Sequence, residues 1–206
     1  MSYAMMRHRG SPPGADRAAT ADSDPRRPAL FLDRDGVLNR RIAGGYVTSP
    51  EALEVLSGAW SAARAARRAG ASVIIVSNQG AIARRVATES DVARVNAVLV
   101  DALGCRGVAV DAVYVCPHHP GAVDVADRAC DCRKPAAGML VAAAEDLGLE
   151  LGSSVMVGDK QSDAAAARAA GIPPSRILRF DAATAGDAGA RSLEAAVRAL
   201  LGGPLR

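Results

Sequence analysis

The sequence has few aromatic residues and no long apolar run. Aromatic residues make up 3% of the 206 residues, so a buried core must consist mainly of Ala, Val and Leu, as in Ala-rich helices packed on a Val- and Ile-rich sheet. No segment approaches the ~18 apolar residues of a membrane span, and the N-terminus lacks the apolar core of a secretion signal. These absences favour a cytoplasmic protein without a membrane partner.

Charge of neither sign is concentrated in the folded part of the sequence. The formal net charge is +3, of which residues 1–28 contribute +2. No basic face indicates a nucleic-acid partner. Residues 1–28 are rich in Pro, Gly, Ala, Asp and Arg without periodicity, and such a segment cannot bury enough surface to offset its ordering entropy. We therefore predict a disordered tail over 1–28 and a single domain over 29–206.

Strand and helix patterns alternate from residue 29 onward. Short apolar runs predict strands over 29–32, 71–76, 112–116, 154–157 and 176–180. Helices are predicted over 60–69, 88–103, 136–147, 162–170 and 192–201. The second helix begins with a Thr88–Asp91 capping pattern, and others end at a glycine. This alternation predicts an α/β fold with a doubly wound parallel sheet and helices on both faces.

The first strand ends abruptly at two acidic residues and a glycine, Asp33-Arg34-Asp35-Gly36. Alternation along an extended backbone directs Asp33 and Asp35 to one side, with Arg34 opposite, and Gly36 permits a tight turn. Open α/β sheets bind ligands at the carboxyl ends of their strands. Two carboxylates there suit a magnesium site or a nucleophile with an acid/base partner. The alternative is a strand that ends in a solvated Asp-Gly turn.

Polar residues also follow other predicted strands. Ser77 and Asn78 end the second strand and Asp159 follows the fourth, so parallel pairing brings them to the same edge as Asp33. Asp33 and Asp159 are the carboxylates expected to bind Mg²⁺. The Ser77 hydroxyl and the Lys134 ammonium would hold the equatorial phosphoryl oxygens in the transition state. Taken singly, Ser77 reads as a strand-end residue and Lys134 as a solvated lysine, but their convergence favours the catalytic interpretation.

Three of the four cysteines lie near two histidines. A Cys-x-His and a Cys-x-Cys, eleven residues apart, provide the ligand set Cys116, His118, Cys130 and Cys132. This Cys₃His set suits tetrahedral zinc and leaves no open position on the ion, so the predicted role is structural: to order the loop 116–132. The alternatives are reduced cysteines scattered in a loop, and His119 as the imidazole ligand.

Four segments resemble the motifs of the haloacid dehalogenase-like phosphohydrolases, over roughly residues 29–180. They are Asp33-Arg34-Asp35-Gly36, Ser77-Asn78-Gln79, Arg133-Lys134-Pro135, and Gly158-Asp159 with Asp163. The cysteine loop, the turn 45–47 and the segment 77–84 are similar to those of the D-glycero-D-manno-heptose 1,7-bisphosphate 7-phosphatases. Histidinol-phosphate phosphatases share a version of the cysteine loop. The segment before Gly45 is slightly longer than in the heptose family, and Ser77 stands where many relatives have Thr.

The resemblance implies a Mg²⁺-dependent phosphomonoesterase that removes the 7-phosphate of this heptose bisphosphate through an aspartyl-phosphate. Asp33 is the expected nucleophile and Asp35 the acid/base. The magnesium ligands would be Asp33, Asp159 and the backbone carbonyl of Asp35, with Asp163 orienting Asp159 from behind. The expected substrate contacts are Arg34, Gly45, Tyr46, Ser77, Asn78, Gln79, Gly80, Arg133, Lys134 and Lys160.

Other functions remain compatible with these motifs. One alternative is a phosphatase for histidinol phosphate or another small phosphorylated metabolite. Another is a non-catalytic, zinc-stapled phosphate-binding module, although both Asp33 and Asp35 are present and a degenerate enzyme would be expected to lose them first. The first two motifs are too close in sequence for a separate cap domain. We expect a monomer that acts on a small phosphorylated sugar.

Overall fold

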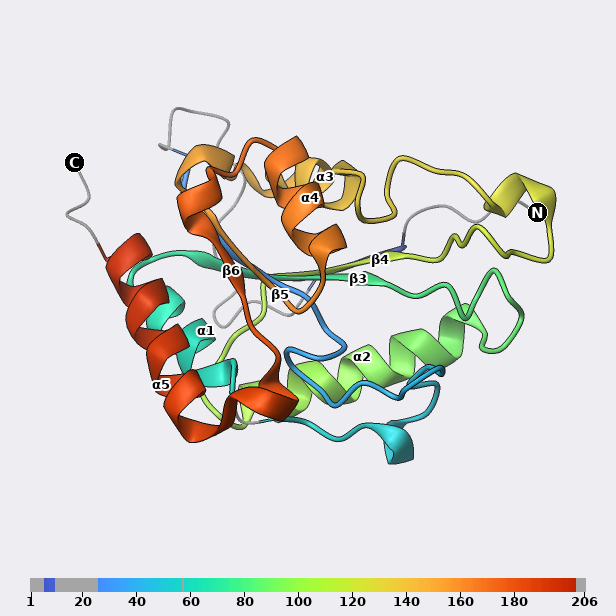
Figure 1. The fold of residues 1–206 in the computed structure, drawn as a ribbon, viewed down its shortest axis with the longest axis horizontal. Helices are drawn as coiled ribbons and strands as arrows, with labels where there is room; N and C mark the ends of the chain where they lie inside the picture. The colour runs from blue at the N-terminus through green and yellow to red at the C-terminus, as the bar shows by residue number, and fades with distance from the viewer. Residues whose placement is uncertain (1–5, 10–25, 57, 203–206) are drawn as a thin grey trace.

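The computed structural model describes residues 6–9, 26–56 and 58–202. Its six-stranded sheet has the order β1-β4-β3-β2-β5-β6 (Figure 1). The strands are β1 (Met6–Arg9), β2 (Ala29–Leu32), β3 (Ser72–Asn78), β4 (Ala112–Cys116), β5 (Val155–Gly158) and β6 (Ile177–Arg179). Strands β2 to β6 are parallel, as predicted, and β1 is antiparallel to β4 at one edge.

The α-helices cover both faces of this sheet. They are α1 (Trp60–Arg68), α2 (Glu89–Gly104), α3 (Gly138–Leu147), α4 (Gln161–Ala169) and α5 (Ala182–Leu201), with 3₁₀ turns at Pro50–Ala52 (η1), Val125–Asp127, Leu151–Ser153 and Pro174–Arg176. Figure 1 shows α3 and α4 on one face and α1, α2 and α5 on the other. Between β2 and β3 the described residues form only η1 and α1, which leaves no cap domain there. No helix in the described ranges is long and apolar enough to cross a membrane.

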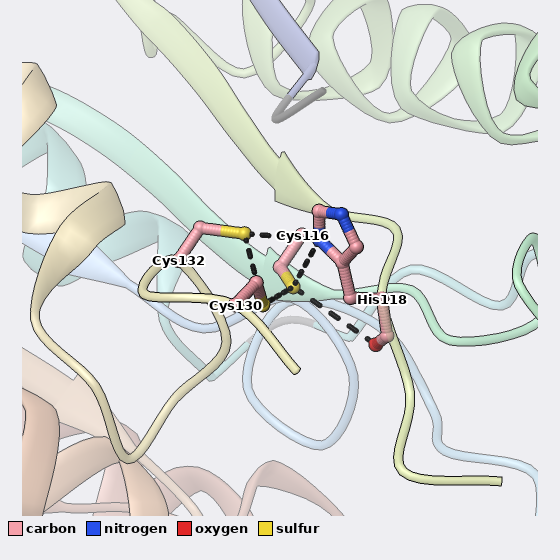
Figure 2. A group of neighbouring side chains, drawn as sticks. All are labelled: Cys116, His118, Cys130 and Cys132. Atoms are coloured by element: carbon pink, nitrogen blue, oxygen red, sulfur yellow. Dashed lines mark hydrogen bonds between the residues drawn. The ribbon is translucent and has the colours of Figure 1, made fainter. Parts of the chain in front are cut away.

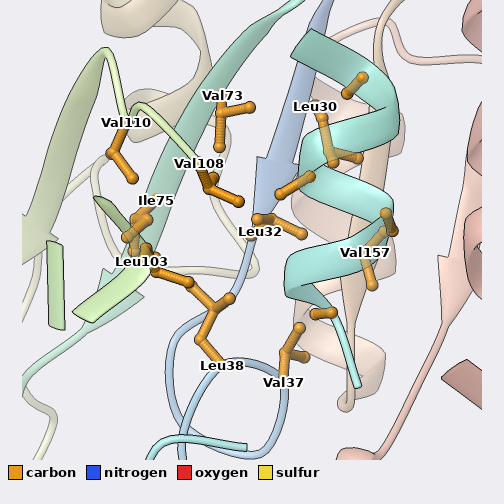
Figure 3. Packing of buried hydrophobic residues seen from close by; sticks show 14 of the residues in the cluster. Leu30, Leu32, Val37, Leu38, Val73, Ile75, Leu103, Val108, Val110 and Val157 are labelled. Carbon is orange, nitrogen blue, oxygen red and sulfur yellow. The ribbon is translucent and has the colours of Figure 1, made fainter. Parts of the chain in front are cut away.

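Side chains of the central strands alternate between two apolar clusters. Leu30 and Leu32 of β2 pack with Val73 and Ile75 of β3 against α1, α2 and α5 (Figure 3). Phe31, between the two leucines, faces the opposite way and packs under α3 and α4. All five side chains are fully buried. Because both faces are covered, the strands read in sequence as continuous apolar runs.

Capping residues predicted the ends of some helices correctly and the start of the last helix wrongly. Thr88 Oγ1 accepts from Asp91 N at 3.1 Å while Thr88 N donates to Asp91 Oδ2 at 2.8 Å, so the predicted capping box is confirmed. Gly148 ends α3 in the left-handed region, at φ 63°. The prediction for the last helix was wrong at its start, because α5 begins at Ala182 rather than near 192. Its first half contains Gly186, which kinks the helix at φ 57° and gives this segment a loop-like composition.

The predicted disordered tail, 1–28, falls largely outside the described residues. The four residues Met6–Arg9 differ from the prediction, because they pair with β4. Residues 26–28 differ as well, because Arg27 O accepts from Glu150 N at 2.9 Å and Pro28 O accepts from Ser72 N at 3.0 Å. Arg7 also forms a salt bridge of 3.0 Å with Asp146. A four-residue edge strand has too little periodicity to be recognised in sequence. For residues 1–5 and 10–25 disorder stays a prediction.

Candidate active site

Asp33 lies immediately after β2, at the carboxyl edge of the sheet. Its backbone N–H donates to Val157 O of β5 at 3.0 Å, which fixes its position between two strands. The side chain is buried. Carboxylate oxygens of Asp33, Asp159 and Asp163 lie within 4.8 Å of one another, the spacing of a possible metal site. The predicted convergence of Asp33 and Asp159 is therefore present in the structure.

The three-carboxylate group concentrates negative charge in a buried place. The pKa of Asp33 is raised to about 6. Burial is the main cause and the Asp163 charge adds to it, while the Lys134 charge acts in the opposite direction. Burial also raises the pKa of Asp159. Asp159 Oδ1 is buried and has no hydrogen-bond partner among the described residues. Hard oxygen donors with an unused position suit Mg²⁺, whose charge would favour the ionised carboxylates.

Lys134 is the buried cation at the centre of this group. Its Nζ lies 2.7 Å from both Asp33 Oδ1 and Asp163 Oδ1, and donates to Val76 O at 2.8 Å. Burial opposes the charge, but the two carboxylates outweigh it and raise the pKa of Lys134 above its ordinary value. Asn78 clamps the lysine backbone, donating to Lys134 O at 2.9 Å and accepting from Lys134 N at 3.0 Å. The solvated-lysine alternative is wrong.

Asp35 is held by a second network of buried side chains. Its Oδ1 accepts from Asn39 Nδ2 at 2.9 Å and Arg34 Nη2 at 3.1 Å, and its Oδ2 accepts from Gln79 Nε2 at 2.7 Å. Arg34 Nη1 donates to Asn96 Oδ1 of α2 at 2.9 Å. Burial opposes ionisation of Asp35, but Arg34 and the hydrogen bonds from Asn39 and Gln79 together lower the pKa of Asp35 below its ordinary value.

A cavity of about 480 Å³ opens over these residues. It is lined by Asp33, Asp35, Gly44, Gly45, Tyr46, Ser77, Asn78, Arg84, Arg133, Lys134, Lys160, Ser162 and Asp163. The guanidinium of Arg84 lies 5.9 Å from the centre of the Tyr46 ring, and its Nη1 lies 3.4 Å from the Tyr46 hydroxyl. Arg84, Arg133 and Lys160 add positive charge to the walls, so the cavity can accept a second anionic group besides the one at Asp33.

Three of the expected substrate contacts do not line this cavity. Arg34 is fully buried and pairs with Asp35. Gln79 is also buried and donates to Asp35. Gly80 lies against the His119 ring, where an added Cβ would come within 2.6 Å of Cδ2. The side-chain contacts of these residues position neighbouring groups, and a role for the three in substrate binding stays a prediction.

Asp163 makes contacts that were not predicted. Its Oδ1 contacts Lys134, and its Oδ2 accepts from the backbone N of Lys160 at 2.9 Å. It therefore holds Lys134 and the start of α4, while the expected role of orienting Asp159 stays a prediction. The sequence prediction also missed Gly44, Arg84 and Ser162 as cavity residues. Arg84 ends the 77–84 segment that carried the family resemblance, and Ser162 immediately precedes Asp163, so position next to a motif was the only available signal.

Three thiols and one imidazole converge at the end of β4 (Figure 2). Cys116 Sγ lies 3.6 Å from Cys130 Sγ and 3.7 Å from His118 Nδ1. Cys132 Sγ lies 3.4 Å from Cys130 Sγ and 3.3 Å from His118 Nδ1. Ligands about 2.3 Å from a tetrahedral zinc are separated by roughly 3.8 Å. The donor types and their spacing therefore fit a zinc ion.

The cysteine cluster also fixes the residues that follow it. Arg133 N donates to Cys130 Sγ at 3.4 Å, and Arg133 Nη1 donates to His118 O at 2.8 Å. Lys134 comes next in the chain and is thereby directed to the carboxylates. The alternative ligand, His119, lies outside the cluster, because its Nδ1 accepts a backbone N–H from its own turn.

Comparison with known proteins identifies the family. The HAD-hydrolase-like family model matches residues 131–179. A D-glycero-β-D-manno-heptose-1,7-bisphosphate 7-phosphatase from Salmonella typhi is 39% identical over 153 residues, which cover 74% of this chain and 80% of that protein. The protein of the same name from Rhodopseudomonas palustris is 41% identical over 75% of this chain and 86% of its own. The chain belongs to the haloacid dehalogenase-like phosphatases.

Solved structures of haloacid dehalogenase-like phosphatases share this architecture. A HAD-like phosphatase from Mesorhizobium loti superposes with a TM-score of 0.80 and 31% identity, over 98% of this chain and 96% of that one. A D,D-heptose 1,7-bisphosphate phosphatase from B. bronchiseptica, complexed with magnesium and phosphate, has a TM-score of 0.63 and 32% identity, over 70% and 77% of the two chains. The fold predicted from sequence is confirmed.

Proposed function

We propose that this phosphatase removes the 7-phosphate of D-glycero-β-D-manno-heptose 1,7-bisphosphate, with Mg²⁺ as cofactor and Asp33 as nucleophile. The observation that carries the proposal is the Lys134 Nζ, 2.7 Å from Asp33 Oδ1, within a buried group of three carboxylates. In this proposal a fixed cation lies beside the nucleophile and supports its attack. The substrate is that named for two relatives about 40% identical to this chain.

In the first chemical step, an Asp33 carboxylate oxygen attacks phosphorus in line and forms the aspartyl-phosphate. The bond between phosphorus and the sugar oxygen breaks, and the sugar oxygen leaves with the electron pair and takes a proton from Asp35. Lys134 and Ser77 hold the equatorial oxygens as charge spreads over them. A magnesium ion held by Asp33, Asp159 and the Asp35 backbone carbonyl would supply further charge neutralisation.

In the second step, water attacks the phosphorus of the aspartyl-phosphate. Asp35 takes a proton from this water, the bond between phosphorus and Asp33 breaks, and inorganic phosphate leaves. The lowered pKa of Asp35 keeps this carboxyl ionised at neutral pH, so it is free to accept the proton. For the acid step Asp35 must be protonated, so the arrival of the phosphate dianion beside it must raise its pKa, as a nearby negative charge does.

The charge of the cavity walls supports a bisphosphate over histidinol phosphate. Arg84, Arg133 and Lys160 line the cavity beyond Asp33. A second phosphate would be attracted by these cations, whereas the amino group of histidinol phosphate would be repelled by them. We propose that these three side chains bind the phosphate that is not transferred, with Tyr46 and Gly45 against the sugar.

The metal assignments follow from donor chemistry. We propose Zn²⁺ on Cys116, His118, Cys130 and Cys132, where it orders the loop 116–132 and takes no part in the chemistry. Thiol burial raises the pKa of Cys130, so a cation is needed to hold it as a thiolate at neutral pH.

A substrate panel tests the proposal. The kcat/KM of the purified protein is measured with Mg²⁺ on both anomers of the heptose bisphosphate and on histidinol phosphate, with an Asp33→Asn preparation as the control for contaminating phosphatase. We expect kcat/KM for the β-anomer to exceed that for histidinol phosphate by at least about 100-fold, which corresponds to roughly 3 kcal/mol of discrimination. A higher value for histidinol phosphate would overturn the substrate. Phosphate binding without turnover would favour the non-catalytic module.

A further inference from the structure

Arg41 forms an ion pair with a proposed metal ligand. Its Nη1 lies 2.8 Å from Asp159 Oδ2, in the segment that follows β2. The Asp159 side chain is only 1% exposed, whereas that of Arg41 is 45% exposed. We propose that Arg41 is a counter-cation of the metal site: it neutralises Asp159 when magnesium is absent and thereby lowers the affinity of the site for Mg²⁺. This inference rests on the magnesium site of the proposed function.

Each of the three carboxylates already forms an ion pair with a basic side chain when no metal is bound. Lys134 pairs with Asp33 and Asp163, and Arg41 pairs with Asp159. This compensation makes a buried acidic cluster tolerable in the metal-free protein, because unpaired charges are costly to bury. A divalent ion that enters the cluster must therefore compete with positive charge that is already there.

The two cations differ in how easily they can withdraw. The Lys134 side chain is 2% exposed, contacts three oxygen atoms and has its backbone clamped by Asn78. Arg41 makes one ion pair within the described part of the chain, and nearly half of its side chain is exposed. Water can solvate the guanidinium after it withdraws, and Mg²⁺ would then compensate the buried Asp159 carboxylate in its place. Arg41 is therefore the cation that can move away when Mg²⁺ binds.

The two carboxylate oxygens of Asp159 differ: Oδ2 contacts Arg41, whereas Oδ1 has no hydrogen-bond partner among the described residues. Its Oδ2 lies between Arg41 and Gly36, where an added Cβ would come within 2.4 Å of that oxygen. Its Oδ1 is buried without a hydrogen-bond partner among the described residues. An ion bound at Oδ1 would share the carboxylate with Arg41, and the two positive charges would repel each other.

A backbone hydrogen bond anchors the chain next to Arg41. Arg40 N donates to Glu54 O at 2.8 Å, and this bond does not involve the Arg40 side chain. Gly44 and Gly45, a few residues further, line the cavity. Arg41 thus links the occupancy of Asp159 to the segment that forms one wall of the cavity.

The inference fixes the sign of a mutational effect on metal affinity. If Arg41 mainly opposes Mg²⁺, Arg41→Gln destabilises the metal-free protein more than the magnesium-bound protein, so the variant binds Mg²⁺ more tightly. Removing one unit charge near a divalent ion at a largely solvated position corresponds to about tenfold in affinity. If Arg41 instead served only to orient Asp159, its loss would weaken binding.

The test compares Arg41→Gln with Arg40→Gln in the full chain. Arg40 is the adjacent residue, and its replacement removes the same charge, but its pair with Glu54 is on the surface. Mg²⁺ dissociation constants are measured by calorimetry, and unfolding temperatures are measured with and without Mg²⁺. We expect about tenfold tighter binding for Arg41→Gln, a lower unfolding temperature only without Mg²⁺, and less than about a twofold change for Arg40→Gln.

Three other results would each overturn a different claim. Unchanged or weaker Mg²⁺ binding by Arg41→Gln, with normal binding by the wild type, would overturn the counter-cation role and leave the proposed function intact. An equal tightening in Arg40→Gln would reduce the effect to general charge and also overturn it. Absence of Mg²⁺ binding by the wild type would overturn the metal site and this inference together.

Discussion

Replacing Asp33 by Asn should abolish catalysis and at the same time stabilise the protein. Burial raises the pKa of Asp33 from 3.8 to about 6, so its carboxyl ionises more easily in the unfolded chain than in the folded one. Ionisation of Asp33 therefore favours unfolding. This destabilising contribution is absent below about pH 4, grows as the pH rises from about 4 to 6, and is complete above about pH 6.

The size of the effect follows from the two pKa values. A difference of roughly 2 pKa units corresponds to about 3 kcal/mol at neutral pH. The Asn variant recovers less than this, because Lys134 loses one of the two carboxylates that its Nζ contacts at 2.7 Å and keeps Asp163. We expect a gain of about 1–3 kcal/mol at pH 7.5 without magnesium, or several degrees in unfolding temperature. Turnover should cease, because an amide does not attack phosphorus.

The assay is unfolding of wild type and Asp33→Asn without added magnesium at pH 7.5 and pH 5. The gain at pH 5 should be about half of that at pH 7.5, since the folded carboxyl is largely protonated there. Asp124→Asn is the control, because the Asp124 side chain is 43% exposed and forms an ion pair only with the exposed Arg85 within the described residues. A variant less stable than wild type at pH 7.5, or a gain independent of pH, would refute the reasoning. Appreciable residual kcat would reassign the nucleophile.

Three further predictions concern the acid, the zinc loop and the edge strand. Asp35→Asn should lower kcat more for a sugar phosphate than for an aryl phosphate, because only the sugar alkoxide needs a proton on departure; equal losses would argue against the acid role. Cys132→Ser should lower zinc content, stability and phosphate affinity together, and elemental analysis showing wild-type zinc with unchanged kinetics would contradict the structural zinc. Deleting residues 1–9 should lower the free energy of unfolding by roughly 1–2 kcal/mol, because β4 loses its antiparallel partner, while kcat stays unchanged; a large fall in kcat would mean that β1 supports the site.

The sequence was most informative where one residue type has one plausible use. Asp33 and Asp35 at the end of an apolar run, and three cysteines beside histidines, predicted sites that the fold then assembles. Strand alternation also predicted that Arg34 points away from the side shared by Asp33 and Asp35. Arg34 does reach Asn96 of α2, but it also pairs with Asp35 at 3.0 Å, so this prediction holds only in part.

Other parts of the site have no local sequence signal. Arg41 and Asp159 meet only because the segment after β2 folds back over the ends of the strands. Asn96 is one polar residue on α2, and nothing in its neighbourhood indicates that it faces Arg34. The start of α5 was missed for a different reason, because the kink at Gly186 gives a helical segment the composition of a loop. Contacts that depend on tertiary folding cannot be derived from local pattern.

The central claim is the selective removal of one phosphate from a bisphosphorylated heptose by Asp33. Phosphorus NMR on D-glycero-β-D-manno-heptose 1,7-bisphosphate, incubated with the wild-type protein and Mg²⁺, follows both phosphates in one experiment. The account predicts that the 7-phosphate signal is replaced by inorganic phosphate while the 1-phosphate signal persists, and that nothing changes with Asp33→Asn. Loss of the 1-phosphate, or no reaction under conditions in which histidinol phosphate is hydrolysed, would contradict it.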